Sequence, residues 1–227
     1  MSETTIGVYT IGQTPRPDLT QDLAGRLEPW RFEIHGVLDG LTQDLIPECP
    51  ADGYPLETRL RNGTRVVVDA AFLEPRLQEA ISVRDGRTSM HLVLCAGDFP
   101  GLRALGPLIQ PFRAAVAELT DRGVGSLDVV VPFVAQARPA LRKWEASGFS
   151  CRAHVLPRMP DDPSLASWLA DRVAGTTSEA LVFDYVGFPA TILRTVADEI
   201  DLPVFDVGRL GLDALERELE KGKGSIR

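Results

Sequence analysis

Short apolar segments that end in turn residues alternate with helical segments along nearly the whole sequence, and this order constrains the fold more than any other feature. Apolar runs bounded by glycine, proline or aspartate predict buried strands, and apolar residues at helical spacing predict amphipathic helices. We expect strands at 5–11, 32–37, 91–94, 127–132, 149–156, 181–185 and 202–205, and helices at 18–27, 72–83, 108–120, 138–147, 163–174, 190–200 and 210–221. Because strands that alternate with helices form parallel sheets with right-handed crossovers, the sequence predicts an α/β protein.

One strand-and-loop pattern occurs twice. The segments His91–Pro100 and Leu181–Pro189 each contain an apolar strand, then a glycine and a Phe-Pro pair. Placing Gly97 over Gly187 sets Cys95 opposite Tyr185. Ligands of open α/β sheets bind beside the carboxyl ends of the strands, so both side chains are predicted to lie at a functional edge.

The repeat predicts two pseudo-symmetric, flavodoxin-like lobes with mostly parallel sheets and a cleft between them. We place the first lobe at residues 1–108 together with 203–227, and the second lobe at 109–202. A β-hairpin near 57–68 interrupts the alternation and is expected to be an insertion in the first lobe. Its Asn62-Gly63 pair, flanked by extended residues, is typical of a type I′ turn.

Composition excludes several classes of function. The 227 residues are 44% hydrophobic, enough for one large α/β domain or two small lobes, and the formal net charge is −8. Nucleic acids and anionic membranes bind basic surfaces, so neither is expected as a partner. No run approaches the roughly 20 apolar residues of a membrane span, and no secretion signal is visible, so we expect a cytoplasmic protein.

The three cysteines, Cys49, Cys95 and Cys151, are too far apart for a zinc motif. An odd, scattered set is typical of free thiols in a reducing compartment. The glycines form neither a dinucleotide-binding motif nor a P-loop. We therefore expect no metal and no cofactor.

Cys95 and Tyr185 are the candidate catalytic residues. Removing a proton beside a carboxylate needs a base, and delivering one to the opposite face needs an acid. A free thiol has a pKa of about 8.5, so Cys95 needs backbone N–H groups or a cation, for which Arg16 and Arg59 are candidates, to become a thiolate. Tyr185, with a phenol pKa of about 10, is suited to donating a proton. The asymmetric pair favours isomerisation or decarboxylation over reversible racemisation.

Loop residues at the strand ends are candidates for substrate binding. Backbone N–H groups and small hydroxyls there hold anions, Arg16 can pair with a carboxylate, and the two glutamines can orient a carbonyl. The candidates are Gln13, Thr14, Arg16, Arg59, Gly97, Asp98, Gln136, Gly187 and Phe188. Structural alternatives stand beside these roles: Cys95 as a small buried hydrophobe, Tyr185 as a space-filling ring, the arginines as surface charges, and Asp98 and Asp184 as caps of backbone N–H groups.

Five motifs make the chain resemble the AroM family: Thr10–Asp18, Leu38–Leu41, Thr58–Thr64, Leu94–Pro100 and Lys143-Trp144. That family is similar to the aspartate/glutamate racemase superfamily, which includes hydantoin racemases, maleate isomerases and arylmalonate decarboxylases. The resemblance implies two α/β lobes with the active site between them, one cysteine on each lobe, and no metal or organic cofactor.

Cys95 matches the first-lobe cysteine of that superfamily. AroM relatives often have Asp-Cys at the second position, where this chain has Asp184-Tyr185. We therefore expect a cofactor-independent isomerase, racemase or decarboxylase that acts on a small carboxylate or carbonyl compound. The alternatives are a small-carboxylate binding protein that has lost the second cysteine, and a lyase or hydrolase with a nucleophilic cysteine. A homodimer is also expected from the resemblance.

Overall fold

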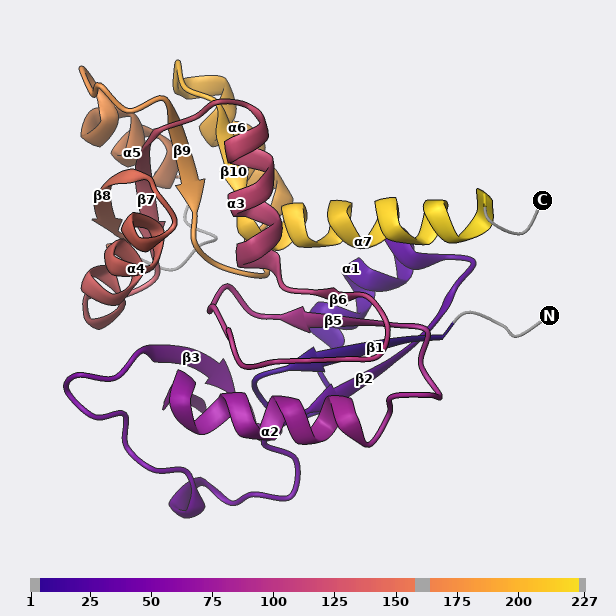
Figure 1. The fold of residues 1–227 in the computed structure, drawn as a ribbon. Helices are drawn as coiled ribbons and strands as arrows, with labels where there is room; N and C mark the ends of the chain where they lie inside the picture. Colours follow the sequence, from indigo (N-terminus) through magenta and orange to yellow (C-terminus); the bar gives the residue numbers. More distant parts are fainter. Residues whose placement is uncertain (1–4, 158–163, 225–227) are drawn as a thin grey trace. The chain divides into compact units, whose positions relative to one another are not determined.

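The computed structural model describes residues 5–157 and 164–224, which form two compact units (Figure 1). The first unit comprises residues 1–111 and 211–227, and the second comprises residues 112–210. The beginning of the helix expected at 163–174 lies outside the described residues.

The first unit is built on a four-stranded parallel sheet with the order β2-β1-β5-β6. Its strands are β1 (Thr5–Thr10), β2 (Arg31–Gly36), β5 (Met90–Leu94) and β6 (Leu108–Ile109). Its helices are α1 (Pro17–Leu27), α2 (Ala70–Ser82) and most of α7 (Val207–Gly224), with a short 3-10 helix at Gln43–Leu45. Figure 1 shows α1 and α7 on one face of the sheet and α2 on the other. The central strands β1 and β5 are buried almost throughout, because helices cover both faces.

The expected β-hairpin is present in the first unit as β3 (Pro55–Arg59) and β4 (Arg65–Asp69), which pair in antiparallel fashion. The predicted type I′ turn is wrong. Such a turn needs positive φ at both central residues, and among the described residues only glycines have it, here Gly63 at 85°. The Gly63 N–H donates to Leu60 O at 2.9 Å and the Leu60 N–H to Thr64 O at 2.8 Å. This pattern is typical of a three-residue loop with glycine in the left-handed position.

The second unit repeats the first. Its strands are β7 (Ser126–Val131), β8 (Ser150–Val155), β9 (Ala180–Phe183) and β10 (Val204–Asp206). The order β10-β9-β7-β8 is the order of β6-β5-β1-β2, and all neighbours are parallel. Its helices are α3 (Pro111–Asp121), α4 (Val134–Ala146), α5 (Leu165–Val173) and α6 (Ala190–Glu199). The predicted pair of flavodoxin-like lobes with parallel sheets is therefore confirmed.

Four local predictions differ from the structure. Leu108 and Ile109 form β6 instead of opening a helix. Helix α4 begins at Val134, one turn earlier than expected, after an extended Phe133. The chain returns to the first unit at Gly211 and not at residue 203, because β10 pairs with β9 in the second sheet. Asp18 lies inside the first turn of α1, and Arg16 occupies the N-cap position.

Candidate active site

Cys95 follows the last residue of β5 at the carboxyl edge of the first sheet. The adjacent strand β1 is in register with β5, so that Thr10 pairs with Leu94. Cys95 packs in the hydrophobic cluster of this unit with Ile11 and Phe99, and 5% of its surface is exposed. The thiol thus lies at the predicted end of the strand, in mostly apolar surroundings.

A backbone amide faces the sulfur. The Gly97 N–H donates to Cys95 Sγ at 3.3 Å, and the Cys95 N–H donates to Val93 O at 3.0 Å. An N–H donor stabilises the negative charge of a thiolate, whereas apolar burial disfavours it. Of the two kinds of group expected to stabilise the Cys95 thiolate, a backbone N–H and a cation, the local geometry supplies the backbone N–H.

The loop that follows Cys95 is fixed by residues that sequence reasoning missed. Gln110 makes two hydrogen bonds to the backbone of Phe99, at 3.1 and 3.2 Å. Glu74 on α2 accepts the Gly101 N–H at 2.6 Å. Asp98 lies half-buried within this loop. These hydrogen bonds fix the loop at Phe99 and at Gly101, and so they hold the Gly97 N–H close to Cys95 Sγ.

The side chain of Gln13 forms hydrogen bonds within its own unit. Its side-chain Nε2 donates to Leu38 O at 2.9 Å and to Leu41 O at 2.7 Å. Its Oε1 accepts the Arg61 N–H at 2.8 Å, which joins the β1 loop to the hairpin. Gln13 is thus a positioning residue for three chain segments.

Thr14 is bound to a carboxylate of the protein itself. Its N–H and its hydroxyl donate to the two oxygens of Asp39, at 2.8 and 2.5 Å. The Gly36 N–H also donates to Asp39, at 3.2 Å. The N–H and hydroxyl groups of Thr14 are thus bound to Asp39, a partner that sequence reasoning missed.

Arg16 and Arg59, the two candidate cations, lie near one carboxylate. Arg16 donates to both oxygens of Asp18, at 2.8 and 2.7 Å. These hydrogen bonds, together with the charges of Arg16 and Arg59, hold the pKa of Asp18 below its usual value. Arg59 is exposed at the end of β3. Arg16 is thus committed to Asp18, while Arg59 stands at the surface of the hairpin.

The second unit places Tyr185 just beyond β9. Its half-buried ring packs against the cluster that contains Phe188, with ring centroids 6.3 Å apart and an edge-on orientation. Gly187 between them has a φ of 89°, a left-handed conformation that favours glycine. Glycine at position 187 is therefore a conformational requirement of this loop.

A buried ion pair stands directly before Tyr185. Lys143 Nζ on α4 lies 2.7 Å from Asp184 Oδ1, and the two side chains are 5% and 0% exposed. Lys143 Nζ also lies 4.3 Å from the centroid of the Phe112 ring. Asp184 therefore binds a cation instead of capping backbone N–H groups. Trp144, the second residue of the Lys143-Trp144 motif, packs edge-on against the same Phe112 ring, with centroids 4.9 Å apart.

Gln136 lies in the first turn of α4 and is 3% exposed. Its Oε1 has no hydrogen-bond partner within the described residues. A buried amide oxygen in this state indicates a site for water or a ligand group.

The other two thiols are in unfavourable surroundings for reaction. Burial raises the pKa of Cys151 to about 12, and burial together with Asp69 raises the pKa of Cys49. In the part of the chain that the structure describes, no three His, Cys, Asp or Glu side chains are placed to hold a metal ion. Nor is any described helix both long and apolar enough to cross a membrane.

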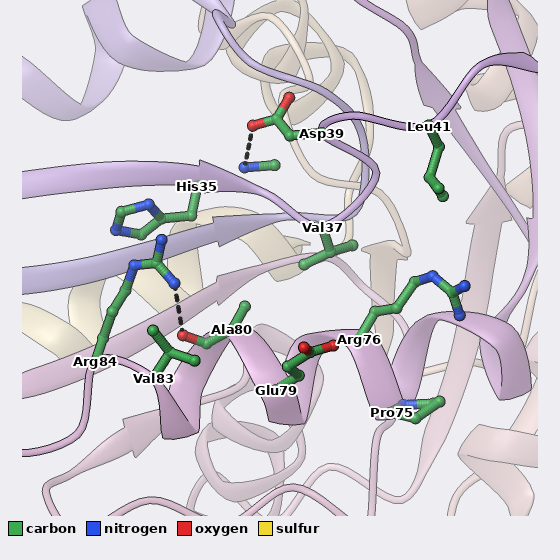
Figure 2. Close-up of a pocket in the computed structure, with 11 residues that line it drawn as sticks. His35, Val37, Asp39, Leu41, Pro75, Arg76, Glu79, Ala80, Val83 and Arg84 are labelled. Carbon is green, nitrogen blue, oxygen red and sulfur yellow. Dashed lines mark hydrogen bonds between the residues drawn. The ribbon is translucent and has the colours of Figure 1, made fainter.

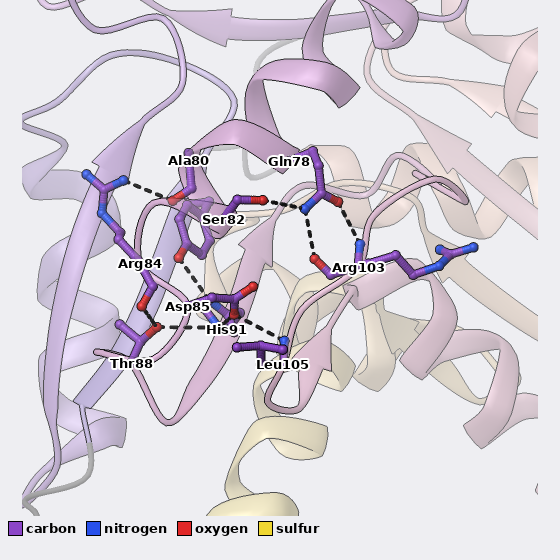
Figure 3. Close-up of polar contacts among 10 residues, drawn as sticks. Gln78, Ala80, Ser82, Arg84, Asp85, Thr88, His91, Arg103 and Leu105 are labelled. Atoms are coloured by element: carbon purple, nitrogen blue, oxygen red, sulfur yellow. Dashed lines mark hydrogen bonds and ion pairs between the residues drawn. The ribbon is translucent and has the colours of Figure 1, made fainter.

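His91 belongs to a buried polar network in the first unit (Figure 3). Its Nδ1 lies 2.9 Å from Tyr9 Oη, and its Nε2 lies 3.0 Å from Asp85 Oδ1. Burial raises the pKa of Tyr9 to about 12 and lowers the pKa of His91. A Cβ on Gly7 would lie 2.6 Å from Tyr9 Oη, so glycine there leaves room for the hydroxyl.

The two units, with the same strand order and a thiol and a phenol at equivalent strand ends, have the fold of the aspartate/glutamate racemase-like proteins. Allantoin racemase from Klebsiella pneumoniae superposes with a TM-score of 0.62 at 20% identity, over 96% of this chain and 89% of the racemase. Unliganded arylmalonate decarboxylase gives 0.60 at 14% identity, over 94% and 91% of the two chains. Maleate cis-trans isomerase from Nocardia farcinica, in a mutant with a covalently bound succinylcysteine intermediate, gives 0.58 at 17% identity, over 96% and 93%.

The chain belongs to the AroM family, since the family model described as AroM protein matches residues 6–210. A search of the curated proteins finds no match.

Proposed function

We propose that this protein is a cofactor-independent enzyme that moves a proton on a small carboxylate or carbonyl compound through Cys95. The observation that supports this most directly is the Gly97 N–H that points at Cys95 Sγ from 3.3 Å, at the carboxyl end of β5. The racemase, isomerase and decarboxylase of similar fold make this class of chemistry the natural one to test.

In this proposal the Cys95 thiolate removes a proton from the carbon beside the carboxylate or carbonyl group. The Gly97 N–H lowers the cost of the thiolate, because it donates to the charged form of the sulfur. Tyr185 is proposed as the proton donor to the same substrate, since a phenol is protonated at neutral pH. As an isomerisation the reaction balances when Cys95 gains one proton, Tyr185 gives one up, and both groups then exchange protons with water. In a decarboxylation CO₂ leaves in place of a proton, and the carbanion takes its proton from Tyr185 or from the Cys95 thiol.

The test is exchange of carbon-bound hydrogen in D₂O across a panel of small carboxylates, hydantoins and malonates, followed by NMR. We expect exchange with at least one compound in the native protein and its loss in Cys95→Ser and Cys95→Ala. Cys151→Ser is the matched control, because the pKa of that thiol is about 12 and it should not contribute. Unchanged exchange in both Cys95 variants would remove the thiol from the mechanism. Saturable binding of a panel compound with no turnover would favour a carboxylate-binding protein instead.

A second candidate is a reaction in which Cys95 bonds covalently to the substrate. The succinylcysteine intermediate of the Nocardia maleate isomerase favours it, because that protein shares this fold. Mass spectrometry of the intact protein, quenched with an unsaturated dicarboxylate present, distinguishes the two. A mass increase equal to the substrate that is absent in Cys95→Ser indicates covalent catalysis, and an unmodified mass during turnover indicates proton transfer alone.

A further inference from the structure

We infer that the first unit contains a second binding site, for a small organic dianion, in a cavity beside β2 and α2. The cavity has a volume of about 570 Å³, within the range of small-molecule sites. It is lined by the last two residues of β2, by the loop that follows them, and by one face of α2 with the turn after it (Figure 2). Cys95 does not line it.

Two arginines provide the positive charge. Arg76 lies on α2, and Arg84 lies in the turn that follows α2, eight positions further along the chain. Figure 2 shows them on either side of Val37. Within the described residues, neither forms an ion pair with a carboxylate. Two unpaired guanidinium groups separated in this way fit a ligand with an acidic group at each end.

Both arginines are held in place before any ligand binds. The Arg76 guanidinium lies over the Phe72 ring, 3.6 Å from its centroid, and its Nη1 donates to Phe72 O at 3.2 Å. Arg84 Nη1 donates to Ala80 O at 2.9 Å. Each guanidinium keeps further N–H donors for a carboxylate, and less side-chain entropy is lost on binding because the groups are already oriented.

His35 lies beside Arg84 in the cavity (Figure 2). Its Nε2 is buried and lies 3.5 Å from Glu33 Oε2. Burial, and then the charge of Arg84, lowers the pKa of His35, so the ring is neutral at neutral pH. A neutral imidazole can donate to or accept from a ligand group that reaches Arg84.

Glu79 sets a limit on the ligand. It lies on the cavity face of α2 between the two arginines in sequence, and it repels a third negative charge near the middle of the ligand. Asp39, the other carboxylate of the lining, accepts hydrogen bonds from Thr14 and lies 3.6 Å from Arg61 Nη2, which offsets its charge. The cavity is therefore suited to a dicarboxylate and unsuited to a tricarboxylate.

The cavity is joined to the loop after β1. Leu41 and Asp39 line it, and they accept hydrogen bonds from the side chain of Gln13 and from Thr14 respectively. A ligand that contacts this wall changes the stability of those hydrogen bonds. Hydrogen exchange at the Thr14 amide should therefore slow or quicken when the cavity is filled.

The test is calorimetric titration of the full chain with succinate, glutarate and adipate, and with acetate, phosphate and sulfate at matched ionic strength. It uses Cys95→Ser protein, so that turnover contributes no heat and the result is independent of the proposed enzymatic function. We expect saturable binding of a dicarboxylate, weakened about tenfold or more by Arg76→Gln and by Arg84→Gln. Arg87→Gln is the matched control, because Arg87 is exposed three residues beyond Arg84 and does not line the cavity.

Two further measurements sharpen the test. Glu79→Gln should improve the binding of citrate relative to succinate, because it removes the central negative charge. Exchange at the Thr14 amide should change with ligand in the parent and not in Arg84→Gln. The inference is overturned if no dicarboxylate binds, if phosphate or acetate binds as tightly as the dicarboxylates, or if folded Arg76 and Arg84 variants bind as the parent does.

Discussion

Replacing Lys143 by methionine removes the cation from a buried ion pair and leaves the Asp184 carboxylate inside the second unit. The Nζ–Oδ1 distance is 2.7 Å, and the side chains are 5% and 0% exposed, so water does not replace the lost partner. Removing one member of such a pair costs about 3–5 kcal/mol in the free energy of unfolding. Domains of this size are stable by about 5–15 kcal/mol, so the loss is a large share of the total.

The double variant Lys143→Met, Asp184→Leu should recover most of this loss. Asp184 Oδ2 has no hydrogen-bond partner within the described residues, so the native pair does not satisfy the carboxylate completely. Exchanging a buried pair for apolar residues of similar volume is often neutral or stabilising. Lys221→Met is the surface control, because Lys221 is 70% exposed beside Glu218 and such pairs contribute about 0–1 kcal/mol.

Urea unfolding followed by tryptophan fluorescence and far-UV circular dichroism measures the effect. Trp144 is fully buried next to Lys143 and reports on the second unit. With a slope of about 1.5 kcal/mol per molar urea, the unfolding midpoint should fall by about 2–3 M in Lys143→Met. A loss below about 1 kcal/mol, or a double variant as unstable as the single one, would refute the reasoning that the carboxylate is stranded.

Three further predictions concern local features. Tyr9→Phe should lower the free energy of unfolding by about 1–3 kcal/mol in urea titrations, because it leaves a buried nitrogen of His91 without its partner; an unchanged midpoint would contradict it. Burial lowers the pKa of His35 and of His91 in the folded state, so the unfolded chain binds more protons than the folded one. The free energy of unfolding should therefore fall as the pH drops below about 6.5. A constant urea midpoint between pH 7.5 and 5.5 would disprove the effect. Gly187→Ala should lower the free energy of unfolding by about 1 kcal/mol in thermal unfolding, because the φ of Gly187 is 89°. Gly25→Ala should raise it by about 0.5–1 kcal/mol, because Gly25 lies in α1 with no atom near an added Cβ. Equal shifts in the two variants would contradict the conformational argument.

The sequence is informative where structure depends on neighbouring residues. The apolar run before Cys95 and the repeated glycine identified both strand ends, since burial and turn formation are local properties. The Asn62-Gly63 hairpin was located correctly, but its turn type was wrong. The pairing of Arg59 with Arg65 fixes the length of the loop, and a dipeptide preference does not determine that length.

Pairs of residues distant in sequence could not be predicted in the same way. Lys143 and Asp184 are 41 positions apart, and Thr14 and Asp39 are 25 apart. Each residue alone is typical of an exposed polar position. Only the packing of helices and strands in the fold brings such residues together, and local patterns do not encode the partner.

Internal hydrogen bonds also affect how readily the candidate binding residues can bind a substrate. Gln13, Thr14 and Arg16 are predicted to hold a substrate, and in the structure each forms hydrogen bonds to a partner in its own unit. Unpaired groups bind ligands at the lowest cost, because no internal hydrogen bond has to break first. Among the predicted binding residues of the first unit, this argument favours the exposed guanidinium of Arg59. Substitution of Arg59 should therefore raise the KM of any substrate with little change in the unfolding midpoint. Gln13→Ala should both raise the KM and lower the unfolding midpoint, because it removes the hydrogen bond between the hairpin and the loop after β1.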